Sequence, residues 1–279
     1  MTNVPIRDVS LFVKVIGQGY PLVLMHGGPG QDYTSLLPLE ALADQFTLIF
    51  YDHRCNGHST GADVSTMTWE NLTTDADALR QTLGFDKWAV LGHSFGGQVA
   101  LEYALHNPNS LSHLILMNTG GDCWVHQNAP EILHKRGYNA ATVQAARCFY
   151  SGQITVSEYF PSFLRFAGAY FYRLNLLGMA REMLFGPRPK YRPEATIFGF
   201  SQLIAGWTVM DRLGEIIVPA LIIAGRQDFI FPPEHQAILA DRLPNAKLVL
   251  IERAGHNPQM EQTAEVIRII RDFVAAAQP

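Results

Sequence analysis

The segment that decides the fold is KWAVLGHSFGGQVALE, from Lys87 to Glu102. Trp88–Leu91 is a short apolar run of the kind found in strands that are buried on both faces. The run stops at GHSFG (92–96), which matches the pattern G-x-S-x-G. Residues 98–106 then have the composition of a helix, which we expect to end before the following Asn-Pro pair. The sequence therefore predicts a strand that turns directly into a helix, with Ser94 at the turn.

Such a turn explains why two glycines flank the serine at this spacing. Gly92 and Gly96 carry no Cβ, so that the strand and the helix can pack closely on either side of Ser94. The sharp turn forces Ser94 into a strained backbone conformation and holds its Oγ clear of the sheet. The amide of Phe95 lies at a helix N-terminus, where it can face developing negative charge. We interpret the segment as a nucleophile elbow; the alternative is a glycine-rich structural turn.

The composition is that of a globular protein with a large core. Of the 279 residues, 48% are hydrophobic and 16% are charged. A net charge of -4 gives no basic surface, so neither nucleic acid nor an anionic membrane is an expected partner. No apolar run approaches the roughly 20 residues that a bilayer requires, and the first residues lack the pattern of a signal peptide. We expect a cytoplasmic protein, and the sequence does not indicate its oligomeric state.

Other apolar runs place the elbow within a sheet. We expect strands at 9–16, 21–25, 46–51, 111–117, 218–224 and 246–251, and helices at 69–83 and towards the C-terminus. Gly-Gln-Gly at 17–19 suggests that the first two strands form a hairpin. The alternation of strands and helices beyond this point is typical of a doubly wound, mostly parallel α/β sheet.

The loop HGGPG (26–30) follows the second expected strand. Without a Cβ, the backbone at Gly28 can bring its amide close to a substrate oxygen, beside the amide of Phe95. We therefore predict that the Gly28 and Phe95 amides form an oxyanion hole; the alternative is a tight turn only. The loop lacks the spacing and the Lys-Ser/Thr ending of a phosphate-binding loop.

A second polar loop, DHRCNGHS (52–59), follows the strand at 46–51. We expect Asp52 and Arg54 to fix this loop by hydrogen bonds. His53 and His58 are expected to be solvated, since no carboxylate or cysteine completes a metal-ligand set at the required spacing. The three cysteines of the chain also lack such spacing, so the sequence predicts no metal site.

Three side chains that can act together in catalysis follow three different expected strands. Ser94, Asp228 and His256 each lie just after a strand, and in a parallel sheet such residues meet at one edge. His256 would remove the proton of Ser94 and later protonate the leaving group, while Asp228 would hold the imidazole in the right tautomer. Asp122 is the best alternative acid, and His235 is a weaker alternative base.

The residue pattern between positions 122 and 211 differs from that of the rest of the chain. This part has no strand pattern, only helical fragments interrupted by glycine and proline, and 14 of the 30 aromatic residues lie between 149 and 207. We interpret it as a helical cap that shapes an apolar pocket, inserted between two parts of the core at 1–121 and 212–279. The candidates for substrate contacts are Gly27, Phe160, Phe163, Trp207 and Phe229.

From about residue 9 to residue 277 the chain resembles the α/β-hydrolase family. Within that family, HGGPG at 26–30 resembles the proline iminopeptidases, which remove N-terminal residues, above all proline, from short peptides. DHRCNGHS at 52–59 is similar to the Asp-x-Arg-x-x-Gly-x-Ser loop of that group, and GRQD (225–228) and AGH (254–256) match its acid and histidine signatures. The resemblance implies an α/β-hydrolase fold with an inserted cap and a Ser-His-Asp mechanism that needs no cofactor.

The sequence departs from that group at two places. The elbow reads GHSFG, where the group has Gly-Gly-Ser-Trp-Gly, and Gly-His-Ser is commoner in esterases, lactonases and carbon–carbon hydrolases. Some members also carry a glutamate after the triad aspartate to bind the substrate ammonium, but here that position is Phe229. Glu158, Glu182 and Glu194 in the cap are alternative carboxylates for that role, and a solvated position is the simpler interpretation of each.

Four functions are therefore weighed. The first is a serine hydrolase that acts through an acyl-enzyme on small, largely apolar substrates or short peptides, as a proline iminopeptidase-like aminopeptidase. The second is a carboxylesterase or lactonase with the same triad. A cofactor-free oxygenase or lyase and a non-catalytic ligand-binding module are the third and fourth. Retention of all three triad residues argues against the binding module.

Overall fold

A computed structural model describes residues 1–61, 63–174, 184 and 186–276 of the protein. Its centre is an eight-stranded sheet with the order β1-β2-β4-β3-β5-β6-β7-β8. The β1–β2 and β2–β4 pairs are antiparallel and all other neighbours are parallel. The strands are β1 (Thr2–Ile6), β2 (Val9–Ile16), β3 (Tyr20–Met25), β4 (Phe46–Tyr51), β5 (Trp88–His93), β6 (Leu111–Met117), β7 (Ala220–Gly225) and β8 (Ala246–Ile251).

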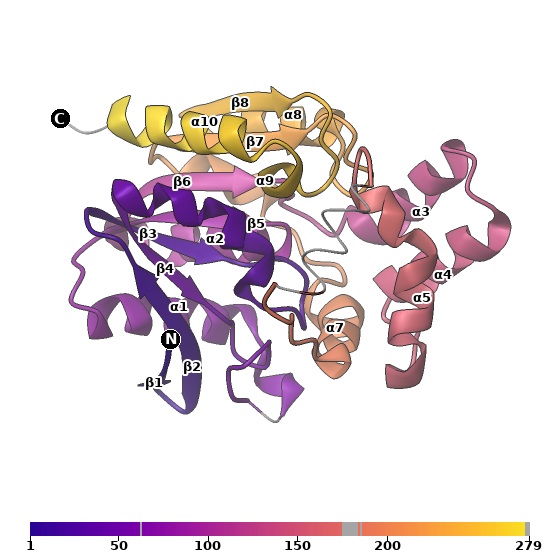
Figure 1. The fold of residues 1–279 in the computed structure, drawn as a ribbon, viewed down its shortest axis with the longest axis horizontal. Coiled ribbons are helices and arrows are strands. Elements are labelled where there is room, and N and C mark those ends of the chain that lie inside the picture. Colours follow the sequence, from indigo (N-terminus) through magenta and orange to yellow (C-terminus); the bar gives the residue numbers. More distant parts are fainter. Residues whose placement is uncertain (62, 175–183, 185, 277–279) are drawn as a thin grey trace.

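Helices cover both faces of the sheet, as expected for strands that are apolar on both sides (Figure 1). On β5, Trp88 and Val90 belong to one hydrophobic cluster, whereas Ala89 and Leu91 belong to the other. The first cluster includes residues of α1 (Trp69–Thr82), α2 (Phe95–His106) and α8 (Pro233–Arg242). The second includes residues of the 3-10 segment η1 (Tyr33–Asp44) and of α10 (Thr263–Ala276), and the short α9 (Pro258–Glu261) contacts both of these elements.

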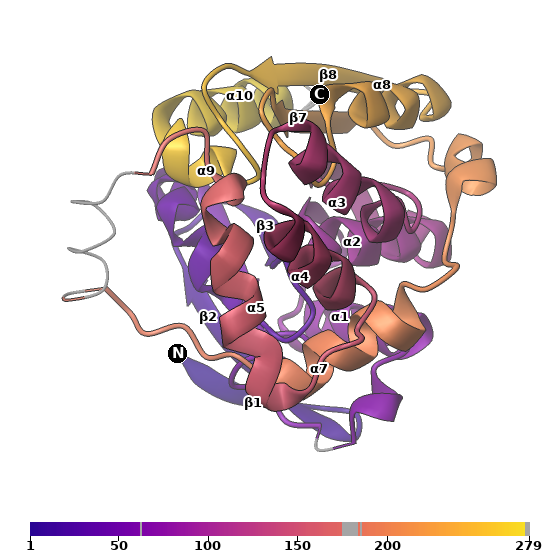
Figure 2. The same ribbon diagram turned by 90° about the vertical axis from the view of Figure 1, so that its right-hand side faces the viewer.

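The insertion between β6 and β7 is helical and lies over one edge of the sheet. The arrowheads of β6 and β8 point towards α3, α4 and α5 in Figure 1, so these helices stand over the carboxyl ends of the parallel strands; Figure 2 looks onto them. The insertion contains α3 (Val125–Lys135), α4 (Ala140–Tyr150), η4 (Val156–Glu158), α5 (Tyr159–Phe166), η5 (Ala167–Tyr170), α7 (Pro193–Phe198) and the π-helical η6 (Gly199–Leu203). Asp122 and Thr208 form an isolated antiparallel bridge near its two ends.

The predicted α/β-hydrolase fold with an inserted helical cap is confirmed, and the domain boundaries at 121/122 and 211/212 stay a prediction. The expected strands at 111–117 and 246–251 match β6 and β8. Three short 3-10 segments outside the cap complete the description: η2 (Val64–Thr66), η3 (Pro108–Ser110) and η7 (Met210–Glu215). In the part of the chain described here, no helix has both the length and the apolar character needed to span a membrane.

The predicted hairpin between 9–16 and 21–25 is wrong. β4 lies between β2 and β3, antiparallel to the first and parallel to the second. The linking glycines carry the chain across the start of β4: Gly17 and Gly19 have φ angles of 79° and 135°, and a Cβ at either would overlap the backbone of residues 43–46. β1, which no sequence pattern predicts, pairs with β2 at the edge of the sheet.

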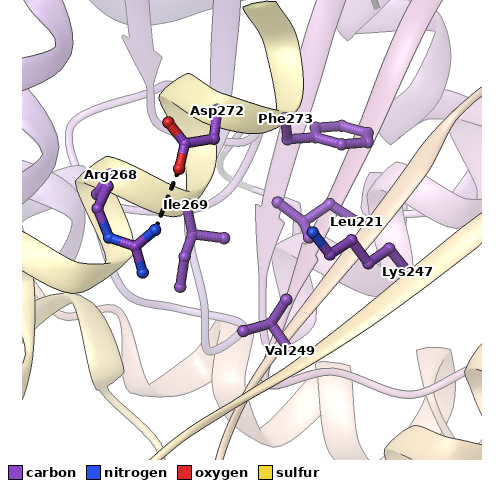
Figure 3. Close-up of a pocket in the computed structure, with 7 residues that line it drawn as sticks. All are labelled: Leu221, Lys247, Val249, Arg268, Ile269, Asp272 and Phe273. Carbon is purple, nitrogen blue, oxygen red and sulfur yellow. Dashed lines mark hydrogen bonds and ion pairs between the residues drawn. The ribbon is translucent and has the colours of Figure 1, made fainter. Parts of the chain in front are cut away.

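A groove of about 370 Å³ lies between α10 and the starts of β7 and β8 (Figure 3). Leu221 on β7 and Lys247 on β8 face each other in register near the amino ends of the two strands. The other lining residues are Val249, Arg268, Ile269, Asp272 and Phe273, and Arg268 pairs with Asp272 at 3.1 Å. This groove therefore lies away from the strand ends that carry the predicted chemistry, and no serine, cysteine or histidine is among its described lining residues.

Candidate active site

Ser94 is the single residue between β5 and α2. Its backbone has φ 53° and ψ -121°, a left-handed conformation that an L-residue adopts at a cost of about 1–3 kcal/mol. A Cβ at Gly92 would overlap the Gly96 carbonyl oxygen, and one at Gly96 would overlap the carbonyl oxygen of Met25. The two glycines thus let α2 pack directly against β5 and β3, as the sequence pattern predicts.

The backbone of Ser94 is fixed by hydrogen bonds while its side chain is not. Its N–H donates to Met117 O at 3.0 Å, and its carbonyl accepts from Gly97 N and from Thr119 Oγ1 at 2.9 Å and 2.6 Å. Among the residues that the structure describes, Ser94 Oγ has no hydrogen-bond partner. The residue as a whole is partly exposed.

His256 and Asp228 form a buried pair. His256 Nδ1 lies 2.9 Å from Asp228 Oδ2, and the two residues are 2% and 1% exposed. The same Oδ2 accepts from Asn118 Nδ2 at 2.7 Å, and Oδ1 accepts from Ile230 N at 2.8 Å. A neutral imidazole that donates from Nδ1 to a carboxylate carries its free lone pair on Nε2. The pair therefore presents a base at Nε2.

The elbow and the histidine loop are in direct contact through His93. Its Nε2 lies 2.9 Å from His256 O and must donate there, because a carbonyl only accepts. The two imidazole rings are 5.0 Å apart, tilted by 45°. Since His93 precedes Ser94, this bond fixes the backbone of His256 beside the elbow. The sequence pattern gives no sign of this contact, because the two residues are 163 positions apart.

Burial, and then the nearby His256, lower the pKa of His93 from 6.5 to about 3. His93 is therefore protonated near pH 6.5 in the unfolded chain but only near pH 3 in the folded chain. Stability falls as the pH decreases between these two values. We expect this residue to lower the free energy of unfolding by about 2 kcal/mol at pH 5 relative to neutral pH, measured by urea unfolding. The variant His93→Gln keeps a donor for His256 O, and its free energy of unfolding should depend less steeply on pH in this range. An unchanged pH dependence would contradict this assignment.

The predicted oxyanion loop lies against the elbow. A Cβ at Gly27 would lie 3.1 Å from Ser94 Cβ and 2.9 Å from His93 Nδ1, so only glycine permits this approach. Gly28 has φ 57°, and a Cβ there would lie 2.6 Å from the side chain of Gln31. The structure thus brings the HGGPG loop and the N-terminus of α2 together at Ser94, which is the arrangement that the oxyanion prediction requires.

The cap is fixed to this same loop. Arg192 N donates to Gly30 O at 2.7 Å, and Thr196 Oγ1 donates to Pro29 O at 2.5 Å. The Arg192 guanidinium also donates to Ser59 O and Gly61 O at 3.1 Å and 3.3 Å. The start of α7 therefore holds the glycine loop from the cap side.

The aromatic residues predicted to contact substrate occupy different surroundings. Phe163 and the fully buried Phe229 pack on Tyr170, with ring centroids at 5.5 Å and 5.3 Å, and Tyr170 itself lies 5.4 Å from His256. Phe160 is 46% exposed and its ring meets Tyr191 instead. The structure thus groups Phe163 and Phe229 near the histidine and leaves Phe160 at the outer surface.

Trp207 reaches the elbow through a second aromatic residue. It packs on Trp69 at 4.7 Å, and Trp69 lies 5.9 Å from Phe95. The indole Nε1 of Trp207 donates to Glu102 Oε1 at 2.6 Å, which satisfies its polar atom inside the protein. The substrate contacts predicted for Trp207 and the other aromatic residues stay predictions.

The alternative acid and the alternative base pair with each other. His235 Nε2 lies 3.1 Å from Asp122 Oδ1, and Trp124 packs on the His235 ring at 4.6 Å. Asp228 and His256 form a separate pair, so Asp122 does not take the place of Asp228. The sequence left this choice open, and the structure decides the pairing.

Asn118 is a residue of the site that sequence reasoning missed. Its backbone has φ 46°, its Nδ2 donates to Asp228 Oδ2 and to Gly255 O, and its Oδ1 accepts from Gly225 N at 3.2 Å. One amide side chain thus links the ends of β6 and β7 to the histidine loop. The signal was present, because Asn118 directly follows β6 as the three predicted residues follow their strands.

The loop at 52–59 confirms one prediction and corrects another. Asp52 accepts from Tyr33 N and His58 N at 2.9 Å and 2.7 Å, and Arg54 makes two bonds to Asp75. The prediction that His53 is solvated is wrong: it is 1% exposed, and burial lowers its pKa well below the ordinary value. Its ring packs against the nearby Tyr51 and against His26 and Phe95, which only the fold brings to it.

The side chains of the described residues contain no group of three or more His, Cys, Asp or Glu that could hold a metal ion. Of the residues predicted to do the chemistry, Asp228 and His256 are hydrogen-bonded to each other. A serine, a histidine and an aspartate can together transfer an acyl group. The arrangement therefore has the groups that hydrolysis of an ester or amide requires.

Comparisons with known proteins agree with this fold. Residues 20–263 match the family model described as "alpha/beta hydrolase fold". The chain is 28% identical to a proline iminopeptidase of Heyndrickxia coagulans, covering 92% of this chain and 91% of the relative, and 26% identical to one of Clostridioides difficile (strain 630), covering 98% and 97%. The crystal structure of proline iminopeptidase from Mycobacterium smegmatis superimposes with a TM-score of 0.77 at 24% identity, over 99% of this chain and 98% of that one. The chain therefore belongs to the α/β-hydrolase fold family and is a hydrolase similar to the proline iminopeptidases.

Proposed function

We propose that the protein is a serine hydrolase that works through an acyl-enzyme formed on Ser94. The observation that carries this proposal is the buried Asp228–His256 pair, joined at 2.9 Å and held beside the elbow by His93. The unengaged hydroxyl of Ser94 and the free Nε2 lone pair of the paired imidazole supply a nucleophile and a base. Asp228 orients the ring and favours its charged form during the reaction.

In the first half of the reaction, Ser94 Oγ attacks the substrate carbonyl as its proton passes to His256 Nε2. The negative charge that develops on the carbonyl oxygen is stabilised by the amides of Gly28 and Phe95. His256 then gives the proton to the leaving group, whose bond to the carbonyl carbon breaks. In the second half, a water molecule loses a proton to His256 and attacks the acyl group. The bond between the acyl carbon and Ser94 Oγ then breaks, and His256 returns the proton to Oγ. These steps require no cofactor.

Among substrates, we propose N-terminal residues of short peptides first. HGGPG at 26–30 and the relatives named proline iminopeptidase, at 25–28% identity over nearly the whole chain, support this choice. The aromatic cluster of the cap beside His256 supplies an apolar wall that suits a compact side chain such as proline. The proposed ligand is thus a small molecule or short peptide.

An ester or lactone is the alternative substrate, and the carboxylates of the cap support it. An aminopeptidase must offer a carboxylate to the substrate ammonium. Glu158 already accepts from Thr155 N at 2.8 Å, and Glu194 pairs with Arg192 at 3.1 Å; Glu182 lies outside the described residues. The GHSFG elbow also fits this alternative.

Rates on aminoacyl-arylamides and on matched substrates with an acetylated amino group distinguish the two. For an aminopeptidase, blocking the amino group removes the ammonium that the site binds, and we expect kcat/KM to fall by at least about 100-fold, or about 3 kcal/mol. Short acyl esters and lactones are assayed in parallel. Equal turnover of free and blocked substrates would overturn the aminopeptidase assignment and leave the esterase or lactonase. Absence of turnover on the whole panel would favour the oxygenase, lyase or binding-module alternatives.

A further inference from the structure

One carboxylate outside the proposed triad connects the cap to the histidine loop. Glu261 ends α9, a short helix that begins just after the His256 loop. Its Oε2 accepts from Gly255 N at 2.7 Å, and its Oε1 accepts from Tyr172 N at 2.8 Å and from Arg173 N at 3.2 Å. A single side chain thus binds three peptide N–H groups from two segments that are distant in the sequence.

The cap segment that Glu261 holds also touches His256. His256 N donates to Tyr170 O at 2.7 Å, and the edge of the Tyr170 ring meets the imidazole at 5.4 Å and 75°. A Cβ at Gly255 would lie 2.5 Å from Tyr170 O, so the two backbones are in closest contact there. The chain that leaves α5 runs beside α9 in Figure 2. The segment 170–173 is therefore a direct neighbour of the histidine.

The charge of Glu261 is balanced by these peptide groups. Within the described residues, no side-chain cation lies within 4 Å of its carboxylate. Carboxylates that accept several N–H groups make strong, charge-assisted hydrogen bonds, whereas an N–H group that loses its acceptor in a buried place is costly. Removal of the carboxylate would therefore release both backbone segments together.

We propose that Glu261 is a positioning residue, which holds the cap segment 170–173 on the histidine loop and so keeps His256 Nε2 aligned with Ser94. The inference rests on the proposed function. His93 and Asp228 hold the histidine from the core side, at its carbonyl and at Nδ1. Glu261 and Tyr170 hold it from the cap side, at the peptide N–H groups of residues 255 and 256. Misplacement of a reacting group by about 1 Å can cost about 100-fold in rate.

The rate at which a fluorophosphonate labels Ser94 tests this role without knowledge of the substrate. We expect Glu261→Ala to be labelled about 10- to 100-fold more slowly than wild type. The labelling rate of Glu261→Gln should lie between those of wild type and Glu261→Ala, because its amide oxygen can still accept from one of the two segments. Glu265→Gln is the matched control: it removes the same charge from an exposed position on α10 and should behave as wild type. Melting temperatures of all variants show whether they fold.

A second measurement separates positioning from general destabilisation. On a substrate that wild type turns over, kcat of Glu261→Gln should fall while KM changes less than about threefold, at a temperature where the variant is fully folded. Labelling of both Glu261 variants, or of the Gln variant alone if the Ala variant does not fold, at the wild-type rate would overturn the inference. Failure of wild type itself to react would instead overturn the proposed function. The two failures are therefore distinguishable.

Discussion

Ser94→Ala is expected to lower kcat by about 10⁴-fold or more on any substrate that wild type hydrolyses. The change removes the proposed nucleophile, and what remains is the stabilisation supplied by the oxyanion amides and by substrate binding. The fold should be preserved, because Ser94 Oγ makes no hydrogen bond within the described part of the chain. Alanine also carries a Cβ, so the positive φ of 53° costs it about as much as it costs serine. Steady-state kinetics and thermal unfolding of the same preparation measure both effects.

His256→Gln provides the matched test of this prediction. When a nucleophile and its base act as one unit, removing the second adds little once the first is lost. We therefore expect the Ser94→Ala/His256→Gln double variant to be about as slow as either single variant. Residual activity of more than a few per cent in Ser94→Ala would show that another group attacks the substrate. Losses that multiply in the double variant would show that the two residues act independently.

Asp228→Asn is expected to lower kcat by about 10³- to 10⁴-fold. Asn118 Nδ2 and His256 Nδ1 both donate to Asp228 Oδ2, while Ile230 N donates to Oδ1. An asparagine has only one oxygen for these three donors, and its NH2 group would face a donor on one side. His256 is then favoured in the tautomer with its proton on Nε2, which cannot accept the proton of Ser94.

Asp122→Asn is the control for that variant. Asp122 pairs with His235 at 3.1 Å, and we expect its replacement to change kcat by only a fewfold. The measurement is kcat and KM of both variants on one substrate, together with their melting temperatures. A larger loss in Asp122→Asn than in Asp228→Asn would reverse the assignment of the acid.

The sequence alone predicts the parts of this protein that depend on local patterns. Trp88–Leu91 reads as a strand because both faces of β5 are buried, and the run at 111–117 coincides with β6, which is also largely buried. The run at 246–251 coincides with the partly buried edge strand β8. The elbow follows from the absence of a Cβ at Gly92 and Gly96. Because the carboxyl ends of parallel strands share an edge, the strand-end positions of Ser94, Asp228 and His256 predict that the three residues meet. The contact between Asp228 and His256 is observed, and the contact of Ser94 with this pair stays a prediction.

Only the tertiary structure decides how distant segments pair. Gly17 and Gly19 suit a hairpin as well as the observed crossing over β4, and the choice depends on β4 fitting between β2 and β3. His53 is buried in part because the rings of His26 and Phe95 from other segments pack on it, which no local pattern records. His93 and Asn118 each contact the histidine loop from more than one hundred positions away in the sequence. Glu261 binds a backbone N–H group of the cap. Local sequence determines which side chains stand at the strand ends, and the packing of the whole chain determines which of them hold one another in place.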